Sequence, residues 1–235
     1  MSGLRITGRV MAAAGLVVGS SAYMAGSAWA AQSGAGASGW AVGYYTPSGN
    51  ALSEAEAAPL SGGVATFDFT DLANTALLIT DQGSQKGALL GNLTGETLSA
   101  TFELVGVDSP FTYYGEPSCG GTDSYVRLFF ETSSAGGFNE THYWWSNPAS
   151  IDLSTLRNGV QATVTASLGS PADWSDYYGN FGSNPNYAAG YQAAVANVIA
   201  VGLSFGGGCF FENGIGTTNG AGSFELNAFS ATATP

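Results

Sequence analysis

The stretch that decides the fold is Thr97-Leu98-Ser99-Ala100-Thr101-Phe102-Glu103-Leu104, in which every even position is apolar and every odd position is polar. The same alternation returns later in the chain, where the apolar positions are Val160, Ala162, Val164, Ala166 and Leu168. A helix would scatter these apolar residues around its circumference, whereas an extended strand places them all on one face. Both stretches therefore predict strands with one buried side and one solvated side.

Further stretches of similar length and apolar content predict more strands, and clusters of glycine, asparagine and serine separate them. These strands are expected at Trp40–Tyr45, Val64–Thr70, Tyr125–Thr132, Thr141–Ser146, Ile199–Phe205 and Ser223–Ser230. One short helix is expected at Tyr187–Ile199, after a long ordered loop at Ala172–Asn186. Asn158-Gly159 and Asn219-Gly220 are dipeptides that favour tight turns. The predicted fold is all-β, a jelly-roll sandwich of two antiparallel sheets with one short helix.

The first thirty residues have the pattern of an export signal. Arg5 and Arg9 precede the apolar stretch Val10–Gly19, and Ala28-Trp29-Ala30 fits a signal-peptidase site. A retained membrane anchor is the alternative, but glycine and serine residues interrupt the apolar stretch. We therefore predict a signal peptide at 1–30, one domain at 31–235 in which 31–63 carry the weakest pattern, and a secreted, extracellular protein without membrane insertion after cleavage.

The charge balance is strongly acidic, with 17 Asp and Glu, five Lys and Arg and a formal net charge of −12. Beyond residue 30 the only basic residues are Lys86, Arg127 and Arg157. Such a chain repels a phosphate backbone, so nucleic acid is not an expected partner, and anionic lipid is disfavoured for the same reason.

Cys119 and Cys209 are the two cysteines, and two thiols in an exported chain are expected to form a disulfide. A zinc site is disfavoured because His142 is the only histidine and has no ligand spacing to either cysteine. No cofactor is expected, although a structural calcium ion is possible. Its oxygen ligands would come from Asp108, Glu116, Asp123, Asp173 or Asp176.

One motif resembles a catalytic site. Gly202-Leu203-Ser204-Phe205-Gly206 matches the nucleophile elbow of hydrolases, which requires a helix directly after the serine and a later histidine. Glycines follow the motif, and no histidine follows His142. Glycoside hydrolysis needs two carboxylates across a cleft, and with 17 acidic residues the sequence does not exclude such a pair. No catalytic residue is assigned.

A binding face is the stronger hypothesis. In Tyr125–Glu131, alternation places Tyr125, Arg127, Phe129 and Glu131 on the side opposite the apolar residues. Aromatic rings stack on the C–H groups of sugars, while a charged pair bonds to hydroxyl groups. In His142–Trp145, either Trp144 or Trp145 points outward; we include Trp144 in the candidate site, together with the loop residue Tyr113. The alternative is that these rings pack inside the protein, as large aromatics in sandwiches commonly do.

The C-terminal part of the chain carries a resemblance. Trp174, the segment Tyr191–Val198, the strand Val201–Phe205 and Gly222-Ser223-Phe224-Glu225-Leu226 follow one another in a recurrent order that ends at Phe229. This order resembles the galactose-binding-like jelly rolls, to which many extracellular carbohydrate-binding modules belong. The resemblance covers roughly residues 95–235 and has no diagnostic motif. It implies sugar binding on a sheet face or at the loop rim, often with a structural calcium ion.

The sequence thus predicts a secreted, non-catalytic binding domain whose partner is a glycan or another extracellular surface component. Two alternatives remain open: a structural cell-surface or matrix protein without a small ligand, and a divergent glycoside hydrolase.

Overall fold

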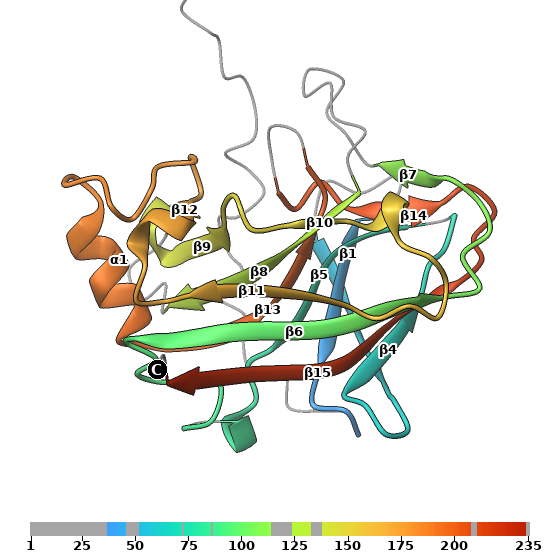
Figure 1. Ribbon diagram of the computed structural model, residues 1–235, viewed down its shortest axis with the longest axis horizontal. Helices are drawn as coiled ribbons and strands as arrows, with labels where there is room; N and C mark the ends of the chain where they lie inside the picture. The colour runs from blue at the N-terminus through green and yellow to red at the C-terminus, as the bar shows by residue number, and fades with distance from the viewer. Residues whose placement is uncertain are drawn as a thin grey trace, which may run out of the picture.

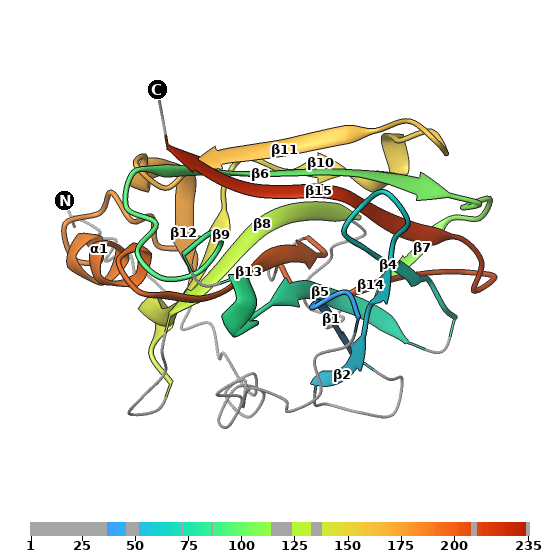
Figure 2. The same cartoon turned by 90° about the horizontal axis from the view of Figure 1, so that it is seen from below.

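The computed structural model describes residues 37–45, 52–71, 73–85, 87–113, 124–132, 138–207 and 211–233. Within these residues, two antiparallel sheets face each other (Figures 1 and 2). The predicted jelly-roll sandwich of two antiparallel sheets with one short helix is confirmed. The predicted signal peptide, Cys119 and Cys209 lie outside the described residues. In the described part of the chain, no helix has both the length and the apolar character needed to cross a membrane.

The larger sheet is built around a central group of long strands. In spatial order its strands are β12 (Trp174–Asp176), β9 (Tyr143–Ser146), β8 (Tyr125–Thr132), β13 (Val198–Phe205), β5 (Asn74–Thr80), β1 (Ala41–Tyr45) and β2 (Leu52–Glu56). Three short strands extend it: β10 (Ile151–Asp152) beside β8, β14 (Ile215–Thr217) beside β5, and β7 (Phe111–Tyr113) beside β14.

The smaller sheet has the order β11 (Ala162–Ser167), β6 (Glu96–Val105), β15 (Ser223–Ala233), β4 (Ala65–Asp68) and β3 (Ala58–Pro59). The helix α1 (Ala188–Val195) lies at one end of the sandwich (Figure 1). Single 3-10 turns occur at η1 (Gly83–Gln85), η2 (Glu140–His142), η3 (Leu153–Thr155) and η4 (Pro171–Asp173).

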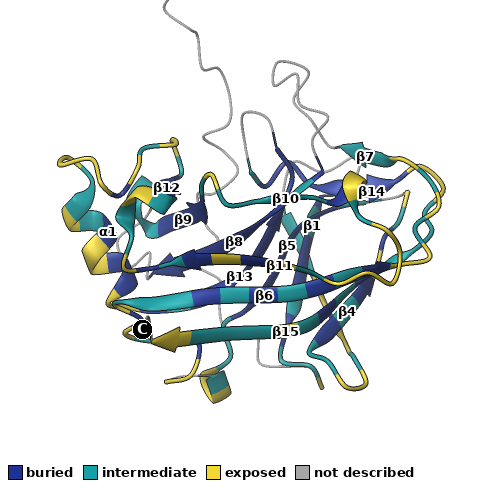
Figure 3. Ribbon diagram, in the orientation of Figure 1, coloured by how far each residue is buried: buried dark blue, intermediate teal, exposed yellow. Residues whose placement is uncertain are grey.

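The main core lies between the two sheets, where the buried strands of Figure 3 face each other. From the smaller sheet, Leu98, Ala100, Phe102 and Leu104 of β6 point inward, as their alternation predicts. From the larger sheet they meet Val126, Leu128 and Phe130 of β8 and alternate residues of β13. Phe102 stacks on Phe224 with ring centroids 4.9 Å apart. This burial is the main source of stability of the sandwich.

Several boundaries differ from the sequence-based prediction. The helix is shorter than the expected Tyr187–Ile199, and the expected loop Ala172–Asn186 contains strand β12. Strand β5 was not predicted, although it lies between β13 and β1. The structure contains the order of elements on which the resemblance to galactose-binding-like jelly rolls was based. Strand β12, helix α1, strand β13 and strand β15 occur in this order along the chain.

Candidate functional site

The outer face of the larger sheet can be assigned from strand register. Val126, Leu128 and Phe130 point into the main core, so the alternate residues of β8 point away from it. Strand β9 pairs with β8 so that Trp145 lies opposite Phe129 and Tyr143 lies opposite Glu131. The side chains of Phe129, Glu131, Trp145 and Tyr143 therefore share the outer face of the larger sheet. The smaller sheet packs on the opposite face.

The structure corrects the choice of Trp144 as a binding residue. Trp144 lies opposite Phe130 on the core side and is fully buried. Its ring lies against Tyr191, with centroids 4.9 Å apart, and its indole N–H donates to the carbonyl of Thr141 at 2.7 Å. The tryptophan on the outer face is Trp145.

The structure also corrects the expectation that the Tyr125–Glu131 face is open. Arg127 is only 8% exposed, and Phe129 and Glu131 are buried. The Phe211 ring covers Arg127, whose guanidinium carbon lies 4.1 Å from the ring centroid. Arg127 also donates to the carbonyl of Gly206 at 3.2 Å. Arg127, Phe129 and Glu131 therefore pack inside the protein, which is the alternative that the sequence left open.

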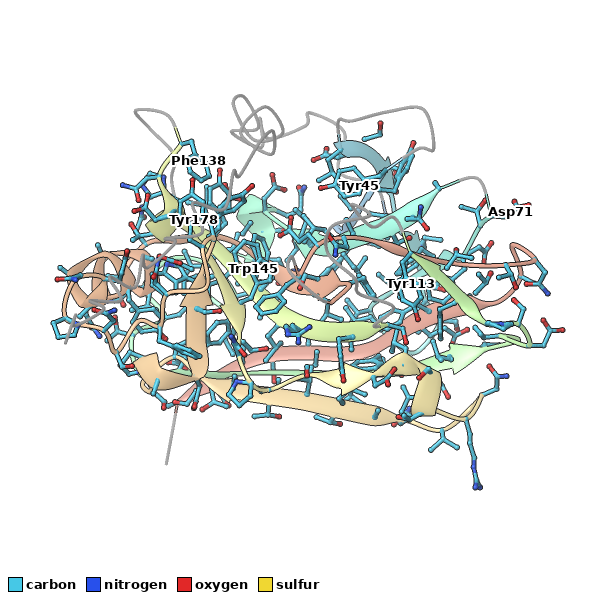
Figure 4. The ribbon with its side chains drawn as sticks, turned by 90° about the horizontal axis from the view of Figure 1, so that it is seen from above. Tyr45, Asp71, Tyr113, Phe138, Trp145 and Tyr178 are labelled. Carbon is cyan, nitrogen blue, oxygen red and sulfur yellow. The ribbon has the colours of Figure 1, made fainter. Side chains whose placement is uncertain are left out.

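The two remaining candidate residues are half-buried and lie apart from each other. The guanidinium carbon of Arg127 lies 5.0 Å from the ring centroid of Tyr125. Tyr113, on β7, packs against the main core. Figure 4 shows Tyr113 well away from Trp145 and towards the other end of the molecule. The structure therefore groups Tyr125 with Arg127 but does not bring Tyr113 to that group.

A continuous row of aromatic rings runs along the outer face and reaches the surface. We call it the aromatic strip; its members are Phe129, Trp145, Tyr143, Tyr177, Phe138 and Tyr178. Neighbouring ring centroids lie between 5.0 and 6.4 Å apart, from Phe129–Trp145 at the inner end to Phe138–Tyr178 at the outer end. Phe138 is 41% exposed and Tyr178 is 66% exposed. Figure 4 shows these two rings close together, with Trp145 farther towards the middle of the sheet.

The turn that carries the outer rings is held by one buried carboxylate. Asp176 accepts from the backbone N–H groups of Tyr178 at 3.0 Å and Asn180 at 2.8 Å, and from the side-chain amide of Asn180 at 3.2 Å. Gly179 supplies the positive φ of 79° that the turn needs. Because both ends of the turn are fixed, Tyr177 and Tyr178 are presented in a preorganised geometry. Tyr177 and Tyr178 are not among the binding residues predicted from the sequence, and the Asp176-Asn180 spacing was the available signal for a fixed turn.

Acidic groups lie against the inner part of the strip. Glu212 is fully buried, and burial raises its pKa to about 8, although the indole N–H of Trp145 acts in the opposite direction. Burial, Glu131 and Glu212 raise the pKa of Tyr143, and burial with Glu212 and Tyr178 raises that of Tyr177. Both phenols therefore stay protonated at neutral pH and can donate hydrogen bonds.

The other candidate sites have different outcomes. Ser204 is buried inside β13, opposite Arg127 on one side and Leu77 on the other, so it does not stand at a strand-to-helix turn. Within the described ranges, no three His, Cys, Asp or Glu side chains are grouped to hold a metal ion. Glu116 and Asp123 lie outside those ranges, and the calcium hypothesis stays a prediction.

Comparison with known proteins gives few matches. No protein-family model matches the chain, and no curated protein matches it. Among solved structures, the chain is similar to a xylan-binding module, CBM15, with a TM-score of 0.41 and 11% sequence identity. The similarity covers 83% of this chain and 91% of that chain.

Proposed function

We propose that the chain is a secreted, non-catalytic glycan-binding domain whose sugar ligand stacks on the outer end of the aromatic strip. The observation that carries this proposal is the Tyr178 ring, which is 66% exposed in a turn fixed by the buried Asp176. Phe138 and Tyr177 lie beside it, with centroids 6.4 and 5.2 Å away. Large exposed rings that touch one another are unusual on a soluble surface and are typical of binding sites.

The chemistry of this surface suits a sugar. Aromatic faces stack on the C–H groups of a pyranose, and a ring held in place before binding loses little conformational entropy. The backbone N–H of Tyr177 donates to the carbonyl of Glu140 at 3.4 Å, which places Glu140 next to the strip. A carboxylate and the phenol of Tyr177 can accept from and donate to sugar hydroxyls.

The charge balance favours a neutral glycan. The chain carries a formal net charge of −12, and the acidic residue Glu140 lies next to the strip. A glycan with uronic acids or sulfates would be repelled. We therefore place neutral polysaccharides first among the ligands to be tested.

The Tyr178→Ala variant tests the site. Loss of one stacking ring should cost about 1 kcal/mol of binding free energy, or roughly a fivefold loss of affinity. Affinity electrophoresis in gels that contain a panel of neutral polysaccharides measures the change. The control is Val160→Ala, which truncates an exposed apolar side chain in the segment just before β11 of the smaller sheet and should leave binding unchanged.

Three results would contradict the proposal. Failure of the wild-type protein to bind any glycan would favour the structural surface or matrix protein, and equal effects of the two variants would remove the assigned site. Glycan turnover that disappears in Glu131→Gln or Glu212→Gln would favour the divergent hydrolase, because these are the two fully buried carboxylates beside the strip.

A further inference from the structure

The turn that carries Tyr178 is the tip of a small hairpin at the edge of the larger sheet. We call residues 174–182 the edge hairpin. Its first leg is β12, the last strand in the sheet order, at the end of the molecule where α1 lies (Figure 1). An antiparallel bridge between Ser175 and Phe181 joins the two legs. The edge hairpin is therefore an extension of the sheet by one short segment.

The edge hairpin presents a second exposed ring, Phe181. In an antiparallel pair, side chains that lie directly opposite each other are on the same face. Trp145 is on the outer face of the larger sheet, Ser175 is its partner in register, and Phe181 is the partner of Ser175. Phe181 therefore lies on the outer face, as the aromatic strip does, and it is 39% exposed.

The backbone around Phe181 is fixed. The N–H of Gly182 donates to the carbonyl of Trp174 at 3.0 Å, and the N–H of Asn184 donates to the carbonyl of Phe181 at 2.9 Å. A Cβ atom built on Gly182 would lie 2.7 Å from Cγ of Tyr191, so this leg of the edge hairpin packs directly against α1. Phe181 is therefore exposed on a preorganised backbone, which lowers the entropy cost of binding.

A small polar residue separates Phe181 from the aromatic strip. In the row across the sheet, Ser175 lies between Trp145 and Phe181, and two strand spacings place these two backbones about 10 Å apart. The side-chain amide of the half-buried Asn147 donates to the Ser175 hydroxyl at 3.2 Å, and its carbonyl oxygen can still accept. Among the described residues, no ring contact joins Phe181 to a member of the strip. Phe181 is therefore a separate stacking surface.

We propose that Phe181 is a second sugar subsite and that the domain binds a linear polysaccharide chain along its length. This inference rests on the glycan-binding function proposed above and specifies its ligand. Tyr178 stacks on one sugar unit, and Phe181 stacks on another unit of the same chain. Both rings are exposed on one rigid hairpin, so one chain can contact them in succession. A single terminal sugar is too small to cover two separate stacking surfaces.

The dependence of affinity on chain length tests the inference. The probes are neutral β-1,4-linked oligosaccharides of glucose, xylose or mannose, from the monosaccharide to the hexasaccharide, and isothermal titration calorimetry measures binding. Wild-type affinity should rise with chain length, and Phe181→Ala should bind the hexasaccharide about fivefold more weakly. The matched control is Val105→Ala, which truncates an apolar side chain of similar exposure on β6 and should bind as the wild type does.

Two further variants separate stacking from folding. Phe181→Tyr keeps the ring face and should bind as the wild type does, whereas Phe181→Leu keeps an apolar side chain without a ring and should bind weakly. Circular dichroism and thermal unfolding check that each variant is folded, and Phe181→Leu replaces Phe181→Ala if the alanine variant does not fold.

The outcomes distinguish this inference from the proposed function. If Tyr178→Ala weakens binding of the hexasaccharide and Phe181→Ala does not, the second subsite is wrong and the glycan-binding function stands. Wild-type affinity that is the same for all chain lengths would also overturn the second subsite, because one sugar unit would then fill the site. If the wild-type protein binds no oligosaccharide of the panel and no polysaccharide, both proposals are wrong.

Discussion

Glu212 shows how one residue can link the aromatic strip to pH. Its carboxyl is fully buried beside Trp145, Tyr143 and Tyr177. Burial raises its folded-state pKa from 4.5 to about 8. Between these two values the folded chain holds a proton that the unfolded chain has released, so stability falls as pH rises through this window.

The Glu212→Gln variant should remove this dependence. Because glutamine stays neutral, the variant should be more stable than wild type by about a few kcal/mol above pH 8, and the two should be similar near pH 4. Urea unfolding at both pH values measures the difference. Glu56→Gln, at an exposed position of β2, is the control and should follow the wild type. A gain that is the same at both pH values would show that packing, and not ionisation of Glu212, is the cause.

Single residues also show where the sequence was insufficient. Alternation restricted the outward tryptophan to Trp144 or Trp145, but both are buried, so hydrophobicity could not choose between them. The choice depends on the register of β9 against β8, in which Trp145 lies opposite Phe129. The exposed ring of Tyr178 depends on Asp176, whose role as the acceptor in a turn is local and was present in the sequence.

At the scale of strands, Gly202 explains why β13 and β5 can pair so closely. A Cβ atom built on Gly202 would lie 2.7 Å from Ile79 Cα and 2.9 Å from Ile79 Cγ2, closer than side chains tolerate. The glycine that completes the hydrolase-like motif with Ser204 is therefore required by strand packing.

The Gly202→Ala variant should be destabilised by about 1–3 kcal/mol, because the added methyl group must push two central strands apart. The midpoint of urea unfolding measures the loss. Gly83→Ala is the matched control, since a Cβ there meets nothing within 4 Å. Equal stability of Gly202→Ala and wild type would mean that β13 can move without cost.

The strands that were predicted and those that were missed differ in their solvent exposure. Strand β6 was recognised because its outer face is polar, which produces alternation. Strand β5 contains the unbroken apolar run Ala76–Ile79 and is buried on both faces, so it has no alternation to detect. Strand β8 was recognised as a strand, but its outer face is covered as well.

At the scale of the molecule, the chain has two apolar layers. The main core between the sheets follows from alternation along single strands. The second cluster, on the outer face of the larger sheet, joins segments far apart in the sequence, such as Tyr45 and Ile79 with Phe129 and Phe211. No local pattern encodes that covering, and this is why the sequence predicted the sandwich but placed the open site on a covered face.

The acidic balance of the whole molecule gives the last prediction. With a net charge of −12, the chain should bind a neutral polysaccharide with an affinity that is nearly independent of salt. A polysaccharide of similar backbone with uronic acid groups should bind more weakly at low salt, because the field of the protein repels it, and the difference should shrink as salt screens that field. Affinity measurements with both polymers at low and high ionic strength test this, with Glu140→Gln as the variant that removes one charge beside the strip. Stronger binding of the acidic polymer at low salt would mean that a basic group dominates recognition, and Arg127, beneath Phe211, would then be the residue to examine.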